Sequence, residues 1–168
     1  MTERVRVEHD FDCSQQQFWQ TFLSADYNRA MFVDDMKFRR WEIVELIEEG
    51  DRVRRAVEVQ PYVGELPAAI KKVIGDTVKY REEGTLDLSK HRYDLRVVPG
   101  ILPGKIQVTG SQYTTELSEE KTRRIFEATV EVKVFGVGGL IEKQIASDMK
   151  KSYERGASFT QKYIKDHA

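Results

Sequence analysis

The C-terminal residues 137–168 constrain the fold more than any other stretch, because they predict one long helix. Glu142, Lys143 and Asp148 are expected on its solvated face. At about 1.5 Å per residue the helix is roughly 40 Å long, so it needs a broad surface to lie against. Apolar or small residues recur at steps of three or four and form one stripe that would face this surface: Ile141, Ile145, Met149, Tyr153, Ala157, Thr160 and Ile164.

Length and composition favour a single domain over residues 1–168. The chain is 40% hydrophobic, which is enough for a core. A net charge of -1, from 27 basic and 28 acidic residues, argues against nucleic acid as a partner, because phosphate binding needs a basic excess. One cysteine excludes an internal disulfide, and three histidines argue against a zinc site. The charged, strand-like N-terminus and the lack of a long apolar run predict a cytoplasmic protein without a signal peptide.

The preceding chain predicts mainly strands. Residues 4–12 alternate between apolar and polar, which predicts a half-buried strand. Ser14 with Gln17 forms a capping-box pattern ahead of one short helix, and a second is expected from Asp26. Pro61 and Pro67 bracket a break in the strand pattern, and a third short helix is expected over residues 66–74. Six further strands are expected over residues 38–47, 52–62, 77–88, 91–98, 105–117 and 122–135.

This order predicts an α+β fold, in which a curved seven-stranded antiparallel sheet wraps around the long C-terminal helix, with two short helices after the first strand. Such a sheet either packs closely against the helix, with no space between them, or leaves a cavity there. Gly84, Gly110 and Ala128 within strands, and Gly156 within the helix, leave room there. A ligand cavity and close packing of helix on sheet are both consistent with these small residues.

Residues at both ends resemble a known superfamily. Phe11-Asp12-Cys13-Ser14, followed by Phe18-Trp19 and Asp26, resembles the opening of START-like helix-grip proteins, the SRPBCC superfamily with the Bet v 1-like fold. Residues 133–143 resemble the strand-to-helix junction of one bacterial branch of unknown function. The resemblance covers the whole chain in element order. It implies a START-like ligand-binding domain whose deep hydrophobic cavity holds sterols, lipids or polyketides, with no cofactor and no fixed catalytic set.

The predicted inward faces supply candidate ligand-binding residues. His9 shares a face with Val5 and Val7, so it is either a polar anchor for the ligand or an interior histidine satisfied by a backbone carbonyl. Arg55 and Glu82 also lie in phase with apolar neighbours, so they must pair, meet a polar ligand group, or be turned outward by a bulge. The other expected ligand-binding residues are Val57, Val59, Tyr80, Leu95, Val108, Gln112, Phe126, Val130, Met149, Tyr153 and Gly156.

Two segments are candidates for a gate to this cavity. Leu66 and Ile70 belong to the predicted short helix, and Ile101 and Leu102 lie in a loop between paired Pro and Gly residues. Together they could form a lid that opens in transient contact with a membrane surface. The alternative is ordinary packing on the rim of the core.

Three functions fit this pattern. The first is a non-catalytic binder or carrier of a hydrophobic small molecule. The second is a polyketide cyclase or aromatase, in which His9, or His91 with Tyr93, acts as general acid and base. The third is a regulatory, protein-binding module with a collapsed cavity. None of them needs a metal, and no phosphate loop or nucleophile elbow is present in the sequence.

Overall fold

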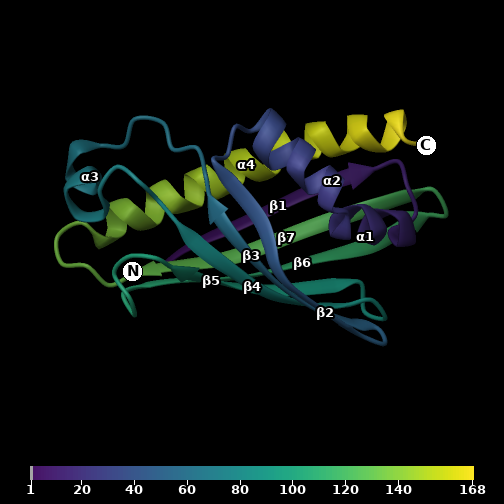
Figure 1. Ribbon diagram of the computed structural model, residues 1–168, viewed down its shortest axis with the longest axis horizontal. Coiled ribbons are helices and arrows are strands. Elements are labelled where there is room, and N and C mark those ends of the chain that lie inside the picture. Colours follow the sequence, from purple (N-terminus) through teal and green to yellow (C-terminus); the bar gives the residue numbers. More distant parts are fainter. Residues whose placement is uncertain (1) are drawn as a thin grey trace.

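The chain forms one antiparallel sheet with a long helix lying across it (Figure 1). The computed structural model describes residues 2–168. Three helices, α1, α2 and α3, are short, and a π-helix, η1, continues α2. The elements are β1 (Thr2–Phe11), α1 (Gln15–Leu23), α2 (Ala25–Asn28), η1 (Arg29–Asp35), β2 (Arg40–Glu49), β3 (Arg52–Gln60), α3 (Ala68–Ile74), β4 (Tyr80–Asp87), β5 (Arg92–Pro99), β6 (Ile106–Ser118), β7 (Lys121–Val132) and α4 (Gly138–Asp166).

The sheet has seven strands in the order β1-β7-β6-β5-β4-β3-β2, and every neighbouring pair is antiparallel. Strands β2 to β7 therefore form a meander, and β1 is added beside β7. Helix α4 packs mainly on β1 and β7, with the sheet curving beneath it. The predicted α+β helix-grip fold is confirmed. Within residues 2–168, no helix combines the length and apolar character needed to cross a membrane.

The start of α4 is fixed by its close approach to the end of β7. A Cβ atom on Gly138 would lie 2.5 Å from the carbonyl oxygen of Val132, so only glycine fits there. One turn later, Glu142 is 1% exposed and its Oε2 accepts a hydrogen bond of 2.8 Å from the Val132 amide. The expectation that Glu142 lies on a solvated face is wrong, because this first turn is covered by the strand end rather than by water.

The segment between β1 and β2 is only partly as expected. Ser14 caps α1, and its Oγ accepts from the Gln17 amide at 3.1 Å. The second short helix, α2, is a single turn and continues directly into the seven-residue π-helix η1, which the sequence pattern did not predict. Cys13 is buried beside this segment, and burial raises the pKa of its thiol to about 11. Such a thiol is protonated and unreactive at neutral pH.

Candidate ligand-binding site

The strand register brings most of the predicted site residues onto the sheet face that α4 covers. Across the sheet, directly paired residues form rows on this face. One row runs through Val57, Glu82, Val97, Val108 and Val130, and its neighbours on either side contain the other predicted strand residues. Those are Val59 with Tyr80, then Arg55 with Leu95, then Gln112 with Phe126.

These residues differ in how completely they are covered. Val57, Phe126 and Val130 are 0% exposed, so the protein's own atoms fill the space around them. Tyr80 is only partly covered, and the Glu82 side chain keeps 22% of its surface accessible on the same face. Met149 and Tyr153, on the opposing face of α4, are likewise only partly covered. These four side chains are therefore less completely covered than Val57, Phe126 and Val130.

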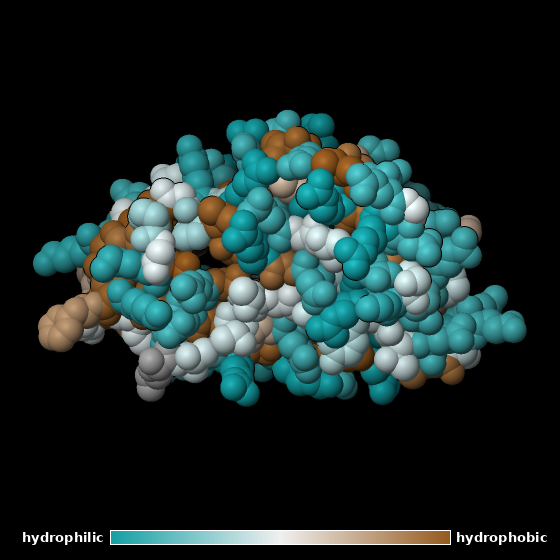
Figure 2. Space-filling model, turned by 90° about the horizontal axis from the view of Figure 1, so that it is seen from below, coloured by the Kyte–Doolittle hydropathy of each residue, from teal (hydrophilic) through white to brown (hydrophobic). Residues whose placement is uncertain are grey.

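Figure 2 shows a hollow in the surface of the molecule. Seen from below, the molecule is hollowed, and hydrophobic atoms surround the hollow. It lies toward the end of the molecule that carries α3 and the start of α4. An apolar rim around a hollow is the usual form of an entrance to a small-molecule site.

A partly buried ion pair lies on this inner face of the sheet. The Nη2 atom of Arg55 is 3.3 Å from Oε2 of Glu82, and the hydroxyl of Tyr93 donates to the same oxygen at 2.9 Å. The Arg55 guanidinium also lies 4.3 Å from the ring centroid of Phe22, a cation–π contact. Arg55 and Glu82 thus pair with each other, which was one of the three arrangements expected from the sequence. No hydrogen bond within the described residues uses the second carboxylate oxygen, Oε1.

Gly84 makes the position of Tyr93 possible. A Cβ atom on Gly84 would lie 2.1 Å from the Tyr93 hydroxyl, so the tyrosine ring occupies the room that a side chain would need. Gly110 and Gly156 are similar, since Cβ atoms there would crowd Phe126 and the sulfur of Met31. At these three glycines the structure favours close packing over a ligand cavity, the two alternatives that the sequence left open. Gly156 faces η1, and its part in a ligand site stays a prediction.

Burial also sets the protonation of the interior tyrosines. It raises the pKa values of Tyr80, Tyr93 and Tyr153 above that of a free tyrosine. All three hydroxyls are therefore protonated at neutral pH and can donate hydrogen bonds. The Tyr153 ring stacks on Phe126 with centroids 3.8 Å apart, which joins α4 to β7 at this point.

A second buried arginine, Arg124, lies under the C-terminal half of α4. Its Nη2 atom is 2.8 Å from Nδ1 of His9 and donates to the Tyr153 carbonyl oxygen at 3.3 Å. Burial and the nearby Arg124 charge lower the pKa of His9, so the imidazole is neutral and its Nδ1 accepts from the arginine. Arg124 was not among the residues expected at the site, although the alternation that places Phe126 and Val130 inward also places Arg124 inward.

The structure separates the two histidines of the proposed acid–base set. Alternation along the sequence places His91 in phase with Tyr93 and Leu95, but in the structure His91 precedes β5 and lies in a turn with φ of 52°. His9 lies on β1 and contacts Arg124 rather than Tyr93. The acidic group that does contact Tyr93 is Glu82.

The four predicted gate residues lie together at one end of the sheet. Ile70 of α3 is 0% exposed and packs in a cluster with Ile106 and Ile141, while Leu66, Ile101 and Leu102 pack around it. They form a hydrophobic cover over the β6–β7 end of the site. Their opening as a gate stays a prediction.

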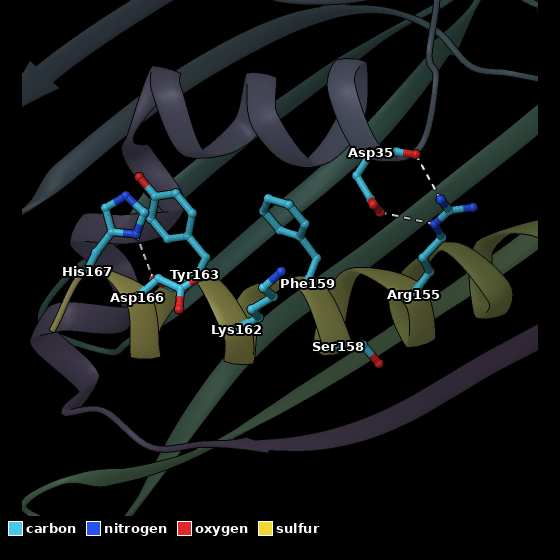
Figure 3. Close-up of a pocket in the computed structure, with 8 residues that line it drawn as sticks. All are labelled: Asp35, Arg155, Ser158, Phe159, Lys162, Tyr163, Asp166 and His167. Atoms are coloured by element: carbon cyan, nitrogen blue, oxygen red, sulfur yellow. Dashed lines mark hydrogen bonds and ion pairs between the residues drawn. The ribbon is translucent and has the colours of Figure 1, made fainter.

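A separate groove of about 460 Å³ lies on the outer side of α4, between that helix and η1 (Figure 3). Aromatic side chains form its floor. An ion pair of 3.1 Å between Asp35 and Arg155 lies among its lining residues. A second groove of about 390 Å³ lies on the outer face of the sheet over β3, β4 and β5, among charged side chains. Neither groove combines the apolar walls and polar centre of the covered face. The lining of the first is Asp35, Arg155, Ser158, Phe159, Lys162, Tyr163, Asp166 and His167.

With this geometry in place, a sequence comparison identifies the family. The profile of a family described as "Protein of unknown function (DUF2505)" matches residues 6–164. The chain belongs to the DUF2505 family. No curated protein matches the chain.

Solved structures establish the fold of this DUF2505 chain. TTHA0849 from Thermus thermophilus is 16% identical, with a TM-score of 0.70 and 99% of each chain covered. The Zhui aromatase/cyclase from Streptomyces sp. R1128 is 13% identical, with a TM-score of 0.63 over 96% of this chain and 90% of that one. Norcoclaurine synthase from Thalictrum flavum is 15% identical, with a TM-score of 0.63 over 100% and 89%. The DUF2505 chain therefore has the Bet v 1-like, START-like fold that its two ends indicated.

Proposed function

We propose that the chain binds a hydrophobic small molecule between the sheet and α4, and that it carries a lipid, sterol or polyketide-like ligand in a cytoplasmic setting. One observation supports this above all. Tyr80, Glu82, Met149 and Tyr153 keep accessible surface on faces that otherwise are closely packed. Apolar walls would supply most of the binding free energy, at about 25 cal/mol per Å² of surface removed from water.

The polar centre of the site suggests which ligand group is recognised. Arg55 already neutralises Glu82, so an additional charged group would be buried without a partner. A hydroxyl or phenol can instead donate to the free Oε1 of Glu82. We therefore favour a ligand with one neutral donor on an otherwise apolar skeleton. Val57, Val59, Leu95, Val108, Gln112, Phe126 and Val130 would support this site from the sheet, with His9 and Arg124 at its packed end.

A matched pair of probes tests the proposal. 2-Naphthol can donate a hydrogen bond, whereas 2-methoxynaphthalene, in which a methyl group replaces the hydroxyl hydrogen, cannot. Binding is followed by thermal shift and titration calorimetry. We expect wild-type protein to prefer the naphthol, and Glu82→Gln to reduce that preference about tenfold, or roughly 1.4 kcal/mol. Glu83→Gln, one residue away on the outer face, is the control and should behave like wild type. Failure of both probes, and of a lipid panel in native mass spectrometry, would refute the binding function.

An enzymatic role of the cyclase or aromatase kind is the second candidate. It is favoured by the contact between the Tyr93 hydroxyl and the Glu82 carboxylate, which resembles an acid paired with a base inside an apolar cavity. A neighbour of the same fold is an aromatase/cyclase. This candidate predicts conversion of a poly-β-keto thioester that Tyr93→Phe abolishes while binding persists. Conversion by wild type and Tyr93→Phe at equal rates would remove Tyr93 from the mechanism.

A further inference from the structure

The end of the molecule that carries α3 exposes a large aromatic side chain. Phe135, in the turn between β7 and α4, is 104% exposed, so nearly all of its ring lies in water. Leu140, in the first turn of α4, is 43% exposed, and Tyr62, which follows β3, is 65% exposed. Leaving a phenylalanine ring in water is costly, and such residues on a surface commonly mark a contact site.

Three chain segments meet at this end. They are residues 61–79, 99–105 and 133–143, and their apolar residues pack together in one cluster around Ile70. The backbone amide of Lys133 also donates to the Lys105 carbonyl oxygen at 2.7 Å, which joins two of the segments directly. We call these three segments the α3 end. Hydrophobic residues gather on this side of the molecule in Figure 2.

The α3 end is also positively charged. Its three segments contain six lysines and three acidic residues, although the whole chain carries a net charge of -1. Two of the acids are already engaged: Glu142 is buried on the Val132 amide, and Asp76 pairs with Lys71 at 3.1 Å. Lys72, Lys79, Lys105, Lys133 and Lys143 are exposed.

The hairpin turns at the opposite end of the molecule have the opposite net charge. The antiparallel order places the β2–β3, β4–β5 and β6–β7 turns together there. Residues 48–52, 87–92 and 116–122, which form these turns, contain seven acidic and four basic residues. These three turns are thus net acidic, whereas the α3 end is net basic and is the one suited to contact with an anionic surface.

We propose that the α3 end docks on an anionic lipid bilayer, with the Phe135 ring inserted among the acyl chains and the lysines on the headgroups. An exposed aromatic ring surrounded by lysines matches the chemistry of an interfacial membrane contact. The hollow of Figure 2 lies toward the same end, so docking would bring it near the lipid. The proposal concerns the surface and does not require that a ligand be bound.

Vesicle flotation tests this proposal. Vesicles of phosphatidylcholine with 30% phosphatidylglycerol, about the anionic content of a charged membrane surface, are compared with pure phosphatidylcholine. We expect the protein to float with the anionic vesicles only, and to be released by salt. Phe135→Ser should lower the bound fraction at least threefold. Its matched control, Leu117→Ser, removes a 41% exposed leucine from the hairpin end and should change nothing.

Two double variants separate the contribution of the lysines from that of the Phe135 ring. Lys105→Gln with Lys133→Gln should weaken flotation and flatten its salt dependence, whereas Lys90→Gln with Lys121→Gln, at the hairpin end, should not. Thermal melts of each variant check that the fold is retained. Absence of flotation, equal flotation of Phe135→Ser, or equal binding to neutral vesicles would overturn the proposal. Self-association that depends on Phe135, without vesicle binding, would show that the α3 end contacts a second copy of the chain. That result would also overturn the proposal.

The vesicle experiment tests membrane docking and the 2-naphthol experiment tests ligand binding, so either can fail without the other. Binding of 2-naphthol without flotation would leave the ligand site and remove the membrane contact. Flotation without probe binding would do the reverse.

Discussion

Two arginines are buried on the inner face of the sheet, and each is accommodated differently. Arg55 has a carboxylate partner in Glu82 and aromatic rings around its guanidinium. Arg124 has no carboxylate within ion-pair distance among residues 2–168; its contacts are the His9 ring, a carbonyl oxygen and the faces of Phe11 and Tyr153. Because a buried charge needs compensation, these contacts depend on His9 remaining a neutral acceptor.

The pH dependence of stability should report this contact. The pKa of His9 is lowered in the folded protein relative to 6.5, so the unfolded chain binds its proton more readily. Stability contributed by neutral His9 is therefore fully present above about pH 6.5 and is lost as the pH falls through the lower folded pKa. We expect a loss of at most about 1 kcal/mol, since the half-buried ring is partly screened by water.

Urea unfolding between pH 8 and pH 5 measures this effect, with His9→Gln as the comparison. Glutamine keeps an acceptor for Arg124 but does not titrate, so this part of the slope should disappear. Identical slopes for the two proteins would mean that His9 titrates alike in the folded and unfolded states.

At the scale of elements, the spacing of apolar residues predicted those helices and strands whose formation depends on the local sequence. The long helix, the strands and the Ser14 cap follow from residue spacing alone, and each lies within a few residues of its predicted place. The π-helix η1 does not, because nothing local distinguishes its seven residues from α-helix. Its geometry is set by tertiary contacts, in which Asp35 binds Arg155 and Met31 lies against Gly156.

Glu142 illustrates the same limit within α4. Spacing places it on the polar side of the helix, but the first turn of α4 crosses the end of β7, where the Val132 amide needs an acceptor. We expect Glu142→Ala to cost about 1–3 kcal/mol in the free energy of unfolding, because that buried amide loses its partner. Lys143→Ala, exposed on the next position, should stay within about 0.5 kcal/mol of wild type. Chemical denaturation compares the two, and equal effects would show that water satisfies the amide instead.

At the scale of the whole molecule, the sheet and α4 are in contact over only part of their common face. The stack of Tyr153 on Phe126 fills one part, and Tyr80 and Glu82 remain accessible in the other. Alternation along single strands was sufficient to find Arg55 and Glu82 as inward charges. It could not show that Tyr93 fills the room left by Gly84, because that contact joins two strands whose register the sequence does not reveal.

Filling the remaining space distinguishes a functional cavity from incomplete packing. Met149 is partly covered and faces the sheet from α4, so Met149→Trp should occupy the room that we assign to the ligand. In a closely packed core such an enlargement costs about 1–3 kcal/mol, whereas in an open cavity it should cost little. We expect near wild-type stability together with at least tenfold weaker binding of 2-naphthol. Phe159→Trp, in the outer groove of Figure 3, is the matched control and should leave binding intact. A strongly destabilised Met149→Trp would show that the space is already full, and undiminished binding would place the probe elsewhere on the molecule.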